Sequence, residues 1–550
     1  MTTAAEAAAR DRAAIAAGTP SFELMLRAGT AAAACVLRGF PDRLSHGVAV
    51  FAGSGNNGGD AYIVAAQLAR AGVLVRLHAS SPARTDDARR AASLAAKYLQ
   101  FGAPAGDERV VVDGLLGTGH RGAFRDGVTH ALAMLGYARD RGAMVVALDV
   151  PSGLDATTGD IAEGSVPAHL SLPFGSVKRG LLLQREHAGR IAVVDIGLHN
   201  PIEPDDRAWY FADEGMVSGL LRPLAWNGHK GMRGHLALVG GATGMAGALV
   251  LATRAALASG CGLAKAYVEA PGVAALQHGA PQAIAMPWPV IGARDRGRRK
   301  AGAQDRSSDA ESRGHAEQRL DSAATRDGPV SARWGDALAI GPGLGRSASS
   351  RALLEHALAA NAGLPVVLDA DALTLAATTG DRAAAAVIQE WCSTSPHVVL
   401  TPHPGEFARL LRGEVPRNWN ARADALTAFA IRSGATVLLK GTPTLIATPD
   451  GEAPVAVARG TALLATGGSG DLLTGIIGAL LASGSSARAA AVLGAVAHGT
   501  AAEIATRDAG GVRGLTLEAV LNALPAAWRG MSHPATLQRD ILSELPSPVY

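Results

Sequence analysis

The chain has 550 residues, of which 48% are hydrophobic and 18% are charged, and its formal net charge is +3. This length predicts more than one domain, and the composition is that of a globular protein. A net charge this small, without a basic stripe, argues against nucleic acid as a partner. The three cysteines, Cys35, Cys261 and Cys392, are far apart, which excludes a disulfide framework and is typical of a reducing compartment.

The sequence suggests neither a signal peptide nor a helix that spans a membrane. The first 18 residues mix acidic and basic side chains and lack the apolar core of a signal peptide. The most apolar helical stretch, residues 472–482, is too short to cross a bilayer. We therefore expect a cytoplasmic protein without a membrane partner.

The first two hundred residues alternate short apolar runs with helical patterns. This rhythm predicts a doubly wound, Rossmann-like parallel sheet. The runs that we predict as strands are residues 47–52, 74–79, 110–113 and 143–149. The pattern weakens around residues 198–222, so we predict that the first domain spans residues 1–213.

A second α/β pattern begins at residue 235 and defines a predicted second domain at residues 221–546. The strands that we predict in it are residues 235–239, 337–340, 366–369, 398–400 and 437–440. Within it, residues 294–329 hold nine basic and seven acidic residues, with Leu320 as the one large aliphatic residue. Such a segment buries too little apolar surface to offset its ordering entropy, which predicts a disordered insertion. A regulatory or partner-binding segment is the alternative.

A glycine-rich turn, residues 53–60, follows the first predicted strand and opens a helix. Its glycines let the backbone approach an anion closely, and the helix start supplies free N–H groups. The side-chain carbonyl oxygens of Asn56 and Asn57 suit a hard cation or a ribose. A structural tight turn is the alternative for the glycines alone.

Two further predicted strands end in an acid, Asp113 and Asp149, and each is followed by a tight loop. Either acid alone could be a helix cap or a turn former. Because ligands bind beyond the carboxyl ends of the strands in doubly wound sheets, the three loops together predict one binding site.

The segments GNNGGD, VVDGLLGTG and VALDVPSGLD resemble, in this order, the three signature loops of the NAD(P)H-hydrate epimerase (YjeF N-terminal) family. The resemblance covers roughly residues 10–200 and includes FGSVK at residues 174–178. It implies that Asp149 is catalytic and contacts the hydrated ring, and that Asn57, Asp113 and Ser152 hold a potassium ion. The residues that it assigns to substrate binding are Asn56, Asn57, Gly58, Gly59, Asp60, Gly117, Thr118, Gly119, His120, Arg121, Gly122, Ala123 and Asp149. The chain departs from the family at Leu26, usually Glu, and at Ala61, usually Gly.

The segment ATGGSGD, residues 465–471, precedes an apolar helical pattern. Successive N–H groups at a helix start form an anion hole for a transferring phosphoryl group, and Asp471 can accept the proton of an attacking hydroxyl. The alternative is a glycine turn with an acid that favours the helix dipole.

This segment resembles the anion-hole motif of the ribokinase-like superfamily. Six further segments resemble, in order, the NAD(P)H-hydrate dehydratases: HKG, GMAGA, IGPGLG, LDADAL, TPHPGE and LKGT. The resemblance implies a catalytic Asp471 and a magnesium-bound nucleotide. The residues that it assigns to the substrate are Ala248, Gly343, His403 and Asp471, and those that it assigns to the nucleotide are Lys440, Gly441, Thr442, Pro443, Thr444 and Gly470. Gln282 and Pro443 depart from the family, and Pro443 removes one backbone donor.

We therefore expect a bifunctional enzyme that epimerises R- and S-NAD(P)H hydrate and dehydrates the S form with ADP. Its expected partners are these small molecules and further copies of itself. A small-molecule kinase with an accessory domain is one alternative, which TPHPGE and LDADAL argue against. A non-catalytic dinucleotide sensor is an alternative for the first domain, which Asp113 and Asp149 argue against. ADP is expected over ATP from the resemblance to bacterial members of the family.

Overall fold

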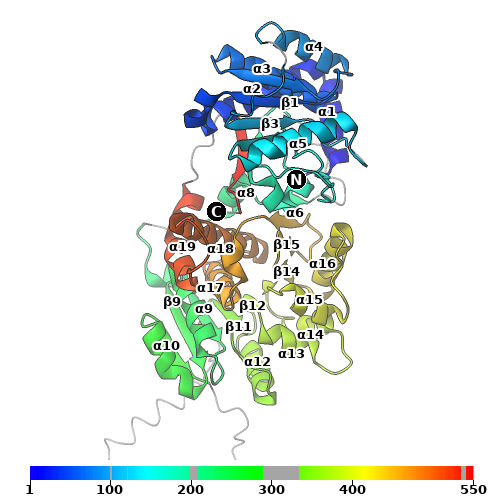
Figure 1. Cartoon of the computed structure of the whole chain (residues 1–550). Helices are drawn as coiled ribbons and strands as arrows, with labels where there is room; N and C mark the ends of the chain where they lie inside the picture. The colour runs from blue at the N-terminus through cyan, green and yellow to red at the C-terminus, as the bar shows by residue number, and fades with distance from the viewer. Residues whose placement is uncertain are drawn as a thin grey trace, which may run out of the picture.

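The computed structural model describes residues 1–99, 102–120, 122–198, 209–223, 226–288, 334–533 and 540–548. These residues form two α/β units, each built around its own sheet (Figure 1). The predicted insertion at residues 294–329 and the predicted substrate residue Arg121 lie outside the described residues.

The first unit is a seven-stranded sheet with the order β17-β6-β5-β4-β3-β1-β2, and all of its strands are parallel except β17. The strands are β1 (Val48–Ala52), β2 (Val75–Ala79), β3 (Val110–Gly114), β4 (Met144–Leu148), β5 (Leu170–Leu172), β6 (Arg190–Val194) and β17 (Ile541–Leu545). Helices α2 (Ser21–Gly39), α3 (Asn56–Arg70) and α4 (Asp86–Ala95) cover one face, and α5 (Asp126–Asp140) covers the other. The predicted doubly wound sheet is confirmed.

Small residues set the spacing between these layers. A Cβ on Gly29 of α2 would lie 2.5 Å from Cβ of Ile63 on α3, so the two helices need glycine to pack this closely. A Cβ on Gly114 would likewise lie 2.5 Å from that of Ala61. Glycine at residue 114 therefore provides the room for Ala61, the residue that departs from the family pattern.

The second unit is a ten-stranded sheet with the order β10-β9-β8-β11-β12-β13-β14-β15-β16-β7. Its strands are β7 (Tyr210–Phe211), β8 (His235–Val239), β9 (Leu263–Val268), β10 (Ile284–Pro287), β11 (Ala337–Ile340), β12 (Val366–Leu368), β13 (Val398–Leu400), β14 (Thr436–Leu439), β15 (Thr444–Ala447) and β16 (Val455–Val457). All neighbouring strands are parallel except that β15 runs antiparallel to β14 and β16.

Helices cover both faces of this sheet. One face carries α9 (Ala246–Ala258), α17 (Ser469–Ala482), α18 (Ala487–Ala509) and α19 (Leu517–Ser532). The other carries α12 (Ala348–Ala360), α13 (Asp371–Ala377), α14 (Ala384–Trp391), α15 (Pro404–Leu411) and α16 (Trp419–Ser433). Of the described helices, α18 alone has the length and composition to cross a membrane, and 83% of its most apolar window is buried in the protein.

Two strands cross the predicted domain limits. β7, which precedes residue 213, pairs with β16 in the second sheet, and β17, near the end of the chain, pairs with β6 in the first. The red C-terminal strand reaches the blue unit in Figure 1. Buried Arg185 reinforces the crossing, because its guanidinium donates to the carbonyls of Ala458 and Pro546. The sequence pattern predicts neither exchange.

Candidate active sites

A cavity of about 740 Å³ opens beyond the carboxyl ends of β1, β3 and β4 in the first unit. Its volume is in the range of small-molecule and cofactor sites, about 300–1,000 Å³. The predicted substrate residues that line it are Asn56, Asn57, Asp60, Gly117, Thr118, Gly119, His120, Ala123 and Asp149. The structure therefore brings most of the first predicted site together.

Three predicted glycines do not line this cavity. A Cβ on Gly58 would lie 1.9 Å from the carbonyl oxygen of Gly53, and one on Gly59 would lie 2.5 Å from Cε of Met25. Gly122 has a φ of 82°, in the left-handed region that favours glycine. These three positions need glycine for backbone packing or conformation rather than for a contact with the cavity.

Asp149 forms an ion pair with Lys178 at the end of β4. Lys178 Nζ contacts Asp149 Oδ1 and donates to the carbonyl of Phe174 at 2.8 Å, and its side chain is only 3% exposed. Asp149 also has a φ of 63°, in the left-handed region that few residues other than glycine adopt and that is enriched at functional sites. The strained backbone aims this carboxylate at the cavity.

Two more carboxyl groups surround this pair. Burial raises the pKa of Asp60 well above its usual value, and the nearby carboxylates of Asp149 and Asp11 raise it further. Burial also raises the pKa of Asp11, against the opposing effect of Lys178. A raised pKa favours the protonated form of Asp60, and that form can donate a proton.

Lys178 and Asp11 had no predicted role. Lys178 carried a signal, since it ends the FGSVK segment. Asp11 carried none, because α1 (Ala4–Ala16) reaches the site only through tertiary contacts. The N-terminus also positions the lysine: Thr2 pairs with the backbone on both sides of Lys178, through Val177 and Arg179.

Of the three residues predicted to hold potassium, Asn57 lies in the first turn of α3, Asp113 in β3 and Ser152 in the loop after β4. Asp113 is 1% exposed and accepts hydrogen bonds from the hydroxyl of Ser152 at 2.6 Å and from its backbone N–H at 2.8 Å. Asn57 Nδ2 donates to the carbonyl of Leu116 at 3.0 Å, and Leu116 N–H donates to Ser152 Oγ at 2.9 Å. Asn57 Oδ1 is buried and has no hydrogen-bond partner among the described residues. An unpartnered buried oxygen beside a carboxylate and a hydroxyl fits a hard cation.

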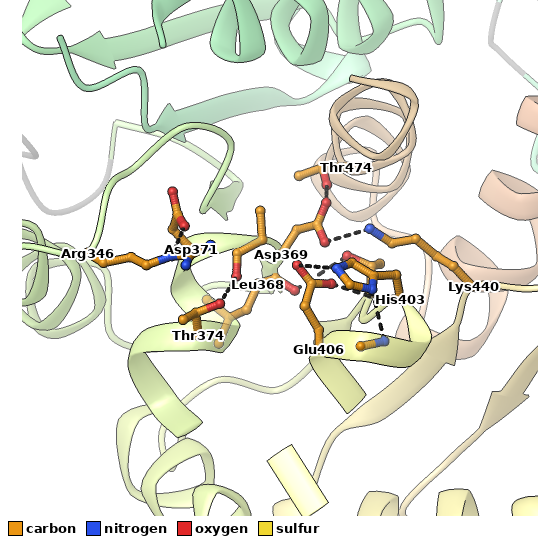
Figure 2. A network of polar contacts seen from close by, with 12 residues as sticks. Arg346, Leu368, Asp369, Asp371, Thr374, His403, Glu406, Lys440 and Thr474 are labelled. Atoms are coloured by element: carbon orange, nitrogen blue, oxygen red, sulfur yellow. Dashed lines mark hydrogen bonds and ion pairs between the residues drawn. The ribbon is translucent and has the colours of Figure 1, made fainter. Parts of the chain in front are cut away.

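The second site is centred on Asp369, at the end of β12. Its carboxylate is 1% exposed, accepts from Lys440 Nζ at 2.8 Å and accepts from the hydroxyl of Thr474 at 2.6 Å. Figure 2 shows Asp369 between Lys440 and Thr474. The next residue, Ala370, has a φ of 50°, so the backbone is strained here as it is at Asp149.

The glycine-rich start of α17 lies against this ion pair. A Cβ on Gly470 would lie 2.9 Å from Lys440 Nζ and 3.5 Å from Asp369 Oδ2, so a side chain here would push the lysine from its present position. Asp471 follows in the first turn of the helix. Burial, and then the nearby carboxylate of Asp369, raise the pKa of Asp471 to about 7. An acid with this pKa can take and return a proton near neutral pH.

The loop after β11 lies beside the start of α9. A Cβ on Gly343 would lie 3.2 Å from Cβ of Ala248, so these two predicted substrate residues are neighbours. Asp371 fixes the same loop, because its carboxylate accepts from Gly345 N–H at 2.9 Å and from Arg346 Nε at 2.8 Å.

His403 caps helix α15. Its Nδ1 accepts from Gly405 N–H at 3.0 Å, and buried Glu406 accepts from the backbone N–H of His403 at 2.8 Å. The side chain remains 52% exposed, and its Nε2 lies 3.6 Å from Glu406 Oε1, so both ring nitrogens face groups of the helix start (Figure 2). The predicted substrate role of His403 thus stays a prediction, and a structural role is added to it.

A smaller cavity of about 170 Å³ adjoins Lys440. Among the predicted nucleotide residues, Lys440, Gly441 and Pro443 line it, whereas Thr442, Thr444 and Gly470 do not. Val415 and Arg422 also line it and were not predicted, because they lie outside the recognisable segments.

Comparison with known proteins defines the class of each unit. Residues 236–525 match the family model described as NAD(P)H-hydrate dehydratase, and residues 21–180 match that of the YjeF-related protein N-terminus. A solved ADP/ATP-dependent NAD(P)H-hydrate dehydratase from Bacillus subtilis is 27% identical, covers 59% of this chain and 99% of its own, and superposes with a TM-score of 0.45.

Full-length relatives carry both units. The bifunctional NAD(P)H-hydrate repair enzyme of Escherichia coli is 32% identical, over 88% of this chain and 86% of its own. That of Moorella thermoacetica is 33% identical, over 93% of each. The chain belongs to the family of bifunctional NAD(P)H-hydrate repair enzymes, and the resemblance inferred from its motifs is confirmed.

Proposed function

We propose that the chain repairs hydrated NADH and NADPH. The first domain interconverts the R and S epimers of the hydrate, and the second uses ADP to dehydrate the S epimer. The proposal rests on one observation: this chain, a member of the family, contains two distinct sites. One encloses the Asp149–Lys178 pair in a large cavity, and the other places Lys440 and Asp471 at a glycine-rich helix start.

Epimerisation requires C6 of the hydrated ring to lose one bond and remake it on the other face. C6 carries a hydroxyl and is bonded to the ring nitrogen. If a base takes the hydroxyl proton while an acid protonates the nitrogen, the C6–N bond breaks and leaves an open-chain aldehyde. Closure on the opposite face inverts C6. Asp149, held by Lys178, is the proposed base, and protonated Asp60 is the proposed acid.

Potassium is the proposed ion of the first site, and Asn57, Asp113 and Ser152 would hold it. The unpartnered Asn57 Oδ1 supports this assignment. When bound, the ion supplies positive charge beside the loops that bind the anionic substrate. The three residues themselves tie the loops after β1, β3 and β4 together, which fixes the edge of the cavity.

Dehydration must make a leaving group, because hydroxide leaves poorly. We infer that the C6 hydroxyl is converted to a phosphate ester, with Asp471 accepting its proton as the terminal phosphoryl group of ADP is transferred and AMP departs. Loss of inorganic phosphate and of a ring proton then restores the double bond. Lys440 and the N–H groups at the start of α17 would stabilise the charge on the phosphoryl group in transit.

Magnesium is proposed to accompany the nucleotide. Mg²⁺ usually keeps several waters and takes many of its ligands from substrate phosphates. Among the described residues, no cluster of three or more His, Cys, Asp or Glu side chains could hold a metal ion, which accords with an ion carried in by the nucleotide.

A cytoplasmic location and a homo-oligomeric state remain predictions from the sequence. The three cysteines are free and buried.

The test supplies the purified protein with separated R- and S-NADHX, with ADP, ATP or neither. We expect S-NADHX to be dehydrated only with nucleotide, and R-NADHX to be consumed through conversion to S. The rate with ADP should exceed that with ATP. Phosphorylation of an unrelated vitamin alcohol, without turnover of either hydrate, would instead support the kinase alternative.

A further inference from the structure

The large cavity of the first domain has a second end, away from Asp149 and Lys178. Arg84, in the loop after β2, and Arg125, the residue before α5, both line the cavity. Both side chains are exposed, and neither guanidinium has an acidic or hydrogen-bonding partner among the residues that the structure describes. Guanidiniums without an acidic partner on the wall of a cavity are available to bind an anion.

Backbone contacts hold this loop in place. Arg84 N–H donates to the carbonyl of Ser54 in the glycine-rich turn at 2.8 Å, and Ser80 N–H donates to that of Ala52 at 2.9 Å. A Cβ on Gly127 would lie 2.4 Å from the carbonyl oxygen of Ser80, so the start of α5 packs directly on the loop. The loop therefore lies between the glycine-rich turn and the start of α5.

The order of the strands fixes how a dinucleotide would lie. Asp149 follows β4 and Arg84 follows β2, and the intervening strands are β3 and β1. Three strand spacings separate the two ends, roughly 14 Å. A substrate with its hydrated ring at Asp149 would pass the glycine-rich turn and place its adenosine ribose beside the loop after β2.

The chemistry at the end of β2 distinguishes the two dinucleotides. In the Rossmann folds that bind dinucleotides, a carboxylate in the corresponding region binds the free ribose 2′-hydroxyl, whereas a nearby arginine accommodates a 2′-phosphate. Here β2 is followed by Ser80 and Ser81, not by an acid. Of the next acids, Asp86 pairs with Arg89, and Asp87, which also lines the cavity, accepts from the hydroxyl of Ser21 with Oδ2.

We propose that the first domain selects the hydrate of NADPH over that of NADH, and that Arg84 and Arg125 bind its 2′-phosphate. This inference rests on the proposed epimerase function and names the preferred substrate of the same site. The two arginines determine specificity and take no part in inverting C6. Arg84 follows β2, three strands from the strand that carries Asp149, and the start of α5, next to Arg125, packs on the same loop as Arg84.

The test compares kcat/KM for R-to-S conversion of NADPHX and NADHX. We expect at least about a tenfold preference for NADPHX, since a charge-assisted hydrogen bond contributes that much or more. The double variant Arg84→Gln/Arg125→Gln should lose the preference by raising KM for NADPHX while kcat with NADHX is unchanged. Arg70→Gln, the same change at an exposed arginine of α3 that does not line the cavity, should keep it.

A competition assay needs no variant. Adenosine 2′,5′-bisphosphate should inhibit epimerisation of NADHX more strongly than 5′-AMP, and added salt should narrow the difference. Equal kcat/KM for the two hydrates, with equal inhibition by the two nucleotides, would overturn the proposed preference and leave the epimerase function intact. Failure to epimerise either hydrate would instead overturn the proposed function.

Discussion

Each of the two sites contains an ion pair between an aspartate and a lysine, but the surroundings of the two pairs differ. Each has an aspartate at the end of a parallel strand, paired with a lysine from a later part of the chain and accompanied by a strained backbone residue. In the first site Lys178 is 3% exposed and shares its space with Asp60 and Asp11. In the second, Lys440 is 22% exposed and faces a glycine-rich helix start.

This difference indicates what each pair can do. The polar contacts of the enclosed lysine among the described residues are the carboxylate of Asp149 and the carbonyl of Phe174, so its charge serves to hold Asp149 in place at the edge of the cavity. The exposed lysine retains access to an anion, and buried Asp369 holds it in position for one. One arrangement suits movement of protons within the site, and the other suits binding of a phosphoryl group.

Removal of the enclosed lysine should have the largest effect. Lys178→Met leaves Asp149 without its partner, and breaking a buried ion pair costs about 3–5 kcal/mol of unfolding free energy. Epimerase activity should fall by about a hundredfold or more. Urea unfolding and the R-to-S assay measure the two effects. A stable, active variant would show that the pair is not needed.

Lys440→Met is the matched change in the second site. We expect loss of nucleotide-dependent dehydration and a loss of stability comparable to that in Lys178→Met. Lys440 is more exposed than Lys178, but the carboxylate that it leaves behind is more buried, since Asp369 is 1% exposed and Asp149 is 14% exposed. R-to-S conversion should be unaffected. Normal dehydration by the folded variant would show that the open pair is not needed to bind the nucleotide.

The pH dependence of dehydration separates the sites further. Because the pKa of Asp471 is raised to about 7, its basic form is lost as pH falls through 7, and kcat/KM for dehydration should fall with it. Asp369→Asn removes a negative neighbour and should move this decline to lower pH. The decline caused by one titrating group spans about one pH unit on either side of its pKa. A profile that is flat from pH 6 to pH 8 would therefore rule out Asp471 as the base.

Removal of β17 tests how the two units are joined. A chain that ends at residue 539 loses the buried side chains of Ile541 and Leu545, and each buried aliphatic side chain contributes about 1.5–3 kcal/mol. Because β17 completes the first sheet, the melting temperature of the transition at which epimerase activity is lost should fall. Dehydratase activity should persist. Equal loss of both activities would mean that the two units unfold together.

Deletion of residues 294–329 should have the smallest effect. Their composition offers little apolar surface to either core, so a short Gly/Ser linker should leave both activities and the melting temperature nearly unchanged. Limited proteolysis of the intact chain should cut in this segment first. Protection of the segment, or a large fall in stability on deletion, would contradict the disordered prediction.

Much of this arrangement could be predicted from the sequence, because strand ends in parallel sheets carry recognisable loops. The apolar runs before Asp149 and Asp369 located the strands, and the glycines around Asn57 and Gly470 located the helix starts. Contacts made by distant segments could not be predicted. Asp11 reaches the first site from α1, and β17 returns to the first sheet from the far end of the chain.

The sequence motifs also do not predict which groups hydrogen-bond to each other. The motif placed Asp113 and Ser152 near a cation, yet nothing in it predicts that they hydrogen-bond to each other. His403 was expected to contact substrate, and its role as the cap of α15 depends on Gly405 and Glu406 adopting helical backbone. Such details follow from geometry that only the folded chain provides.

Crossed assays of Asp149→Asn and Asp471→Asn test most directly whether the chain holds two chemically independent sites. Both variants would be supplied with pure R- and S-NADPHX, with and without ADP. Asp149→Asn should lose R-to-S conversion by about a hundredfold or more yet dehydrate the S epimer normally, and Asp471→Asn should show the reverse. Loss of both activities in either folded variant, or of neither, would contradict the division of labour.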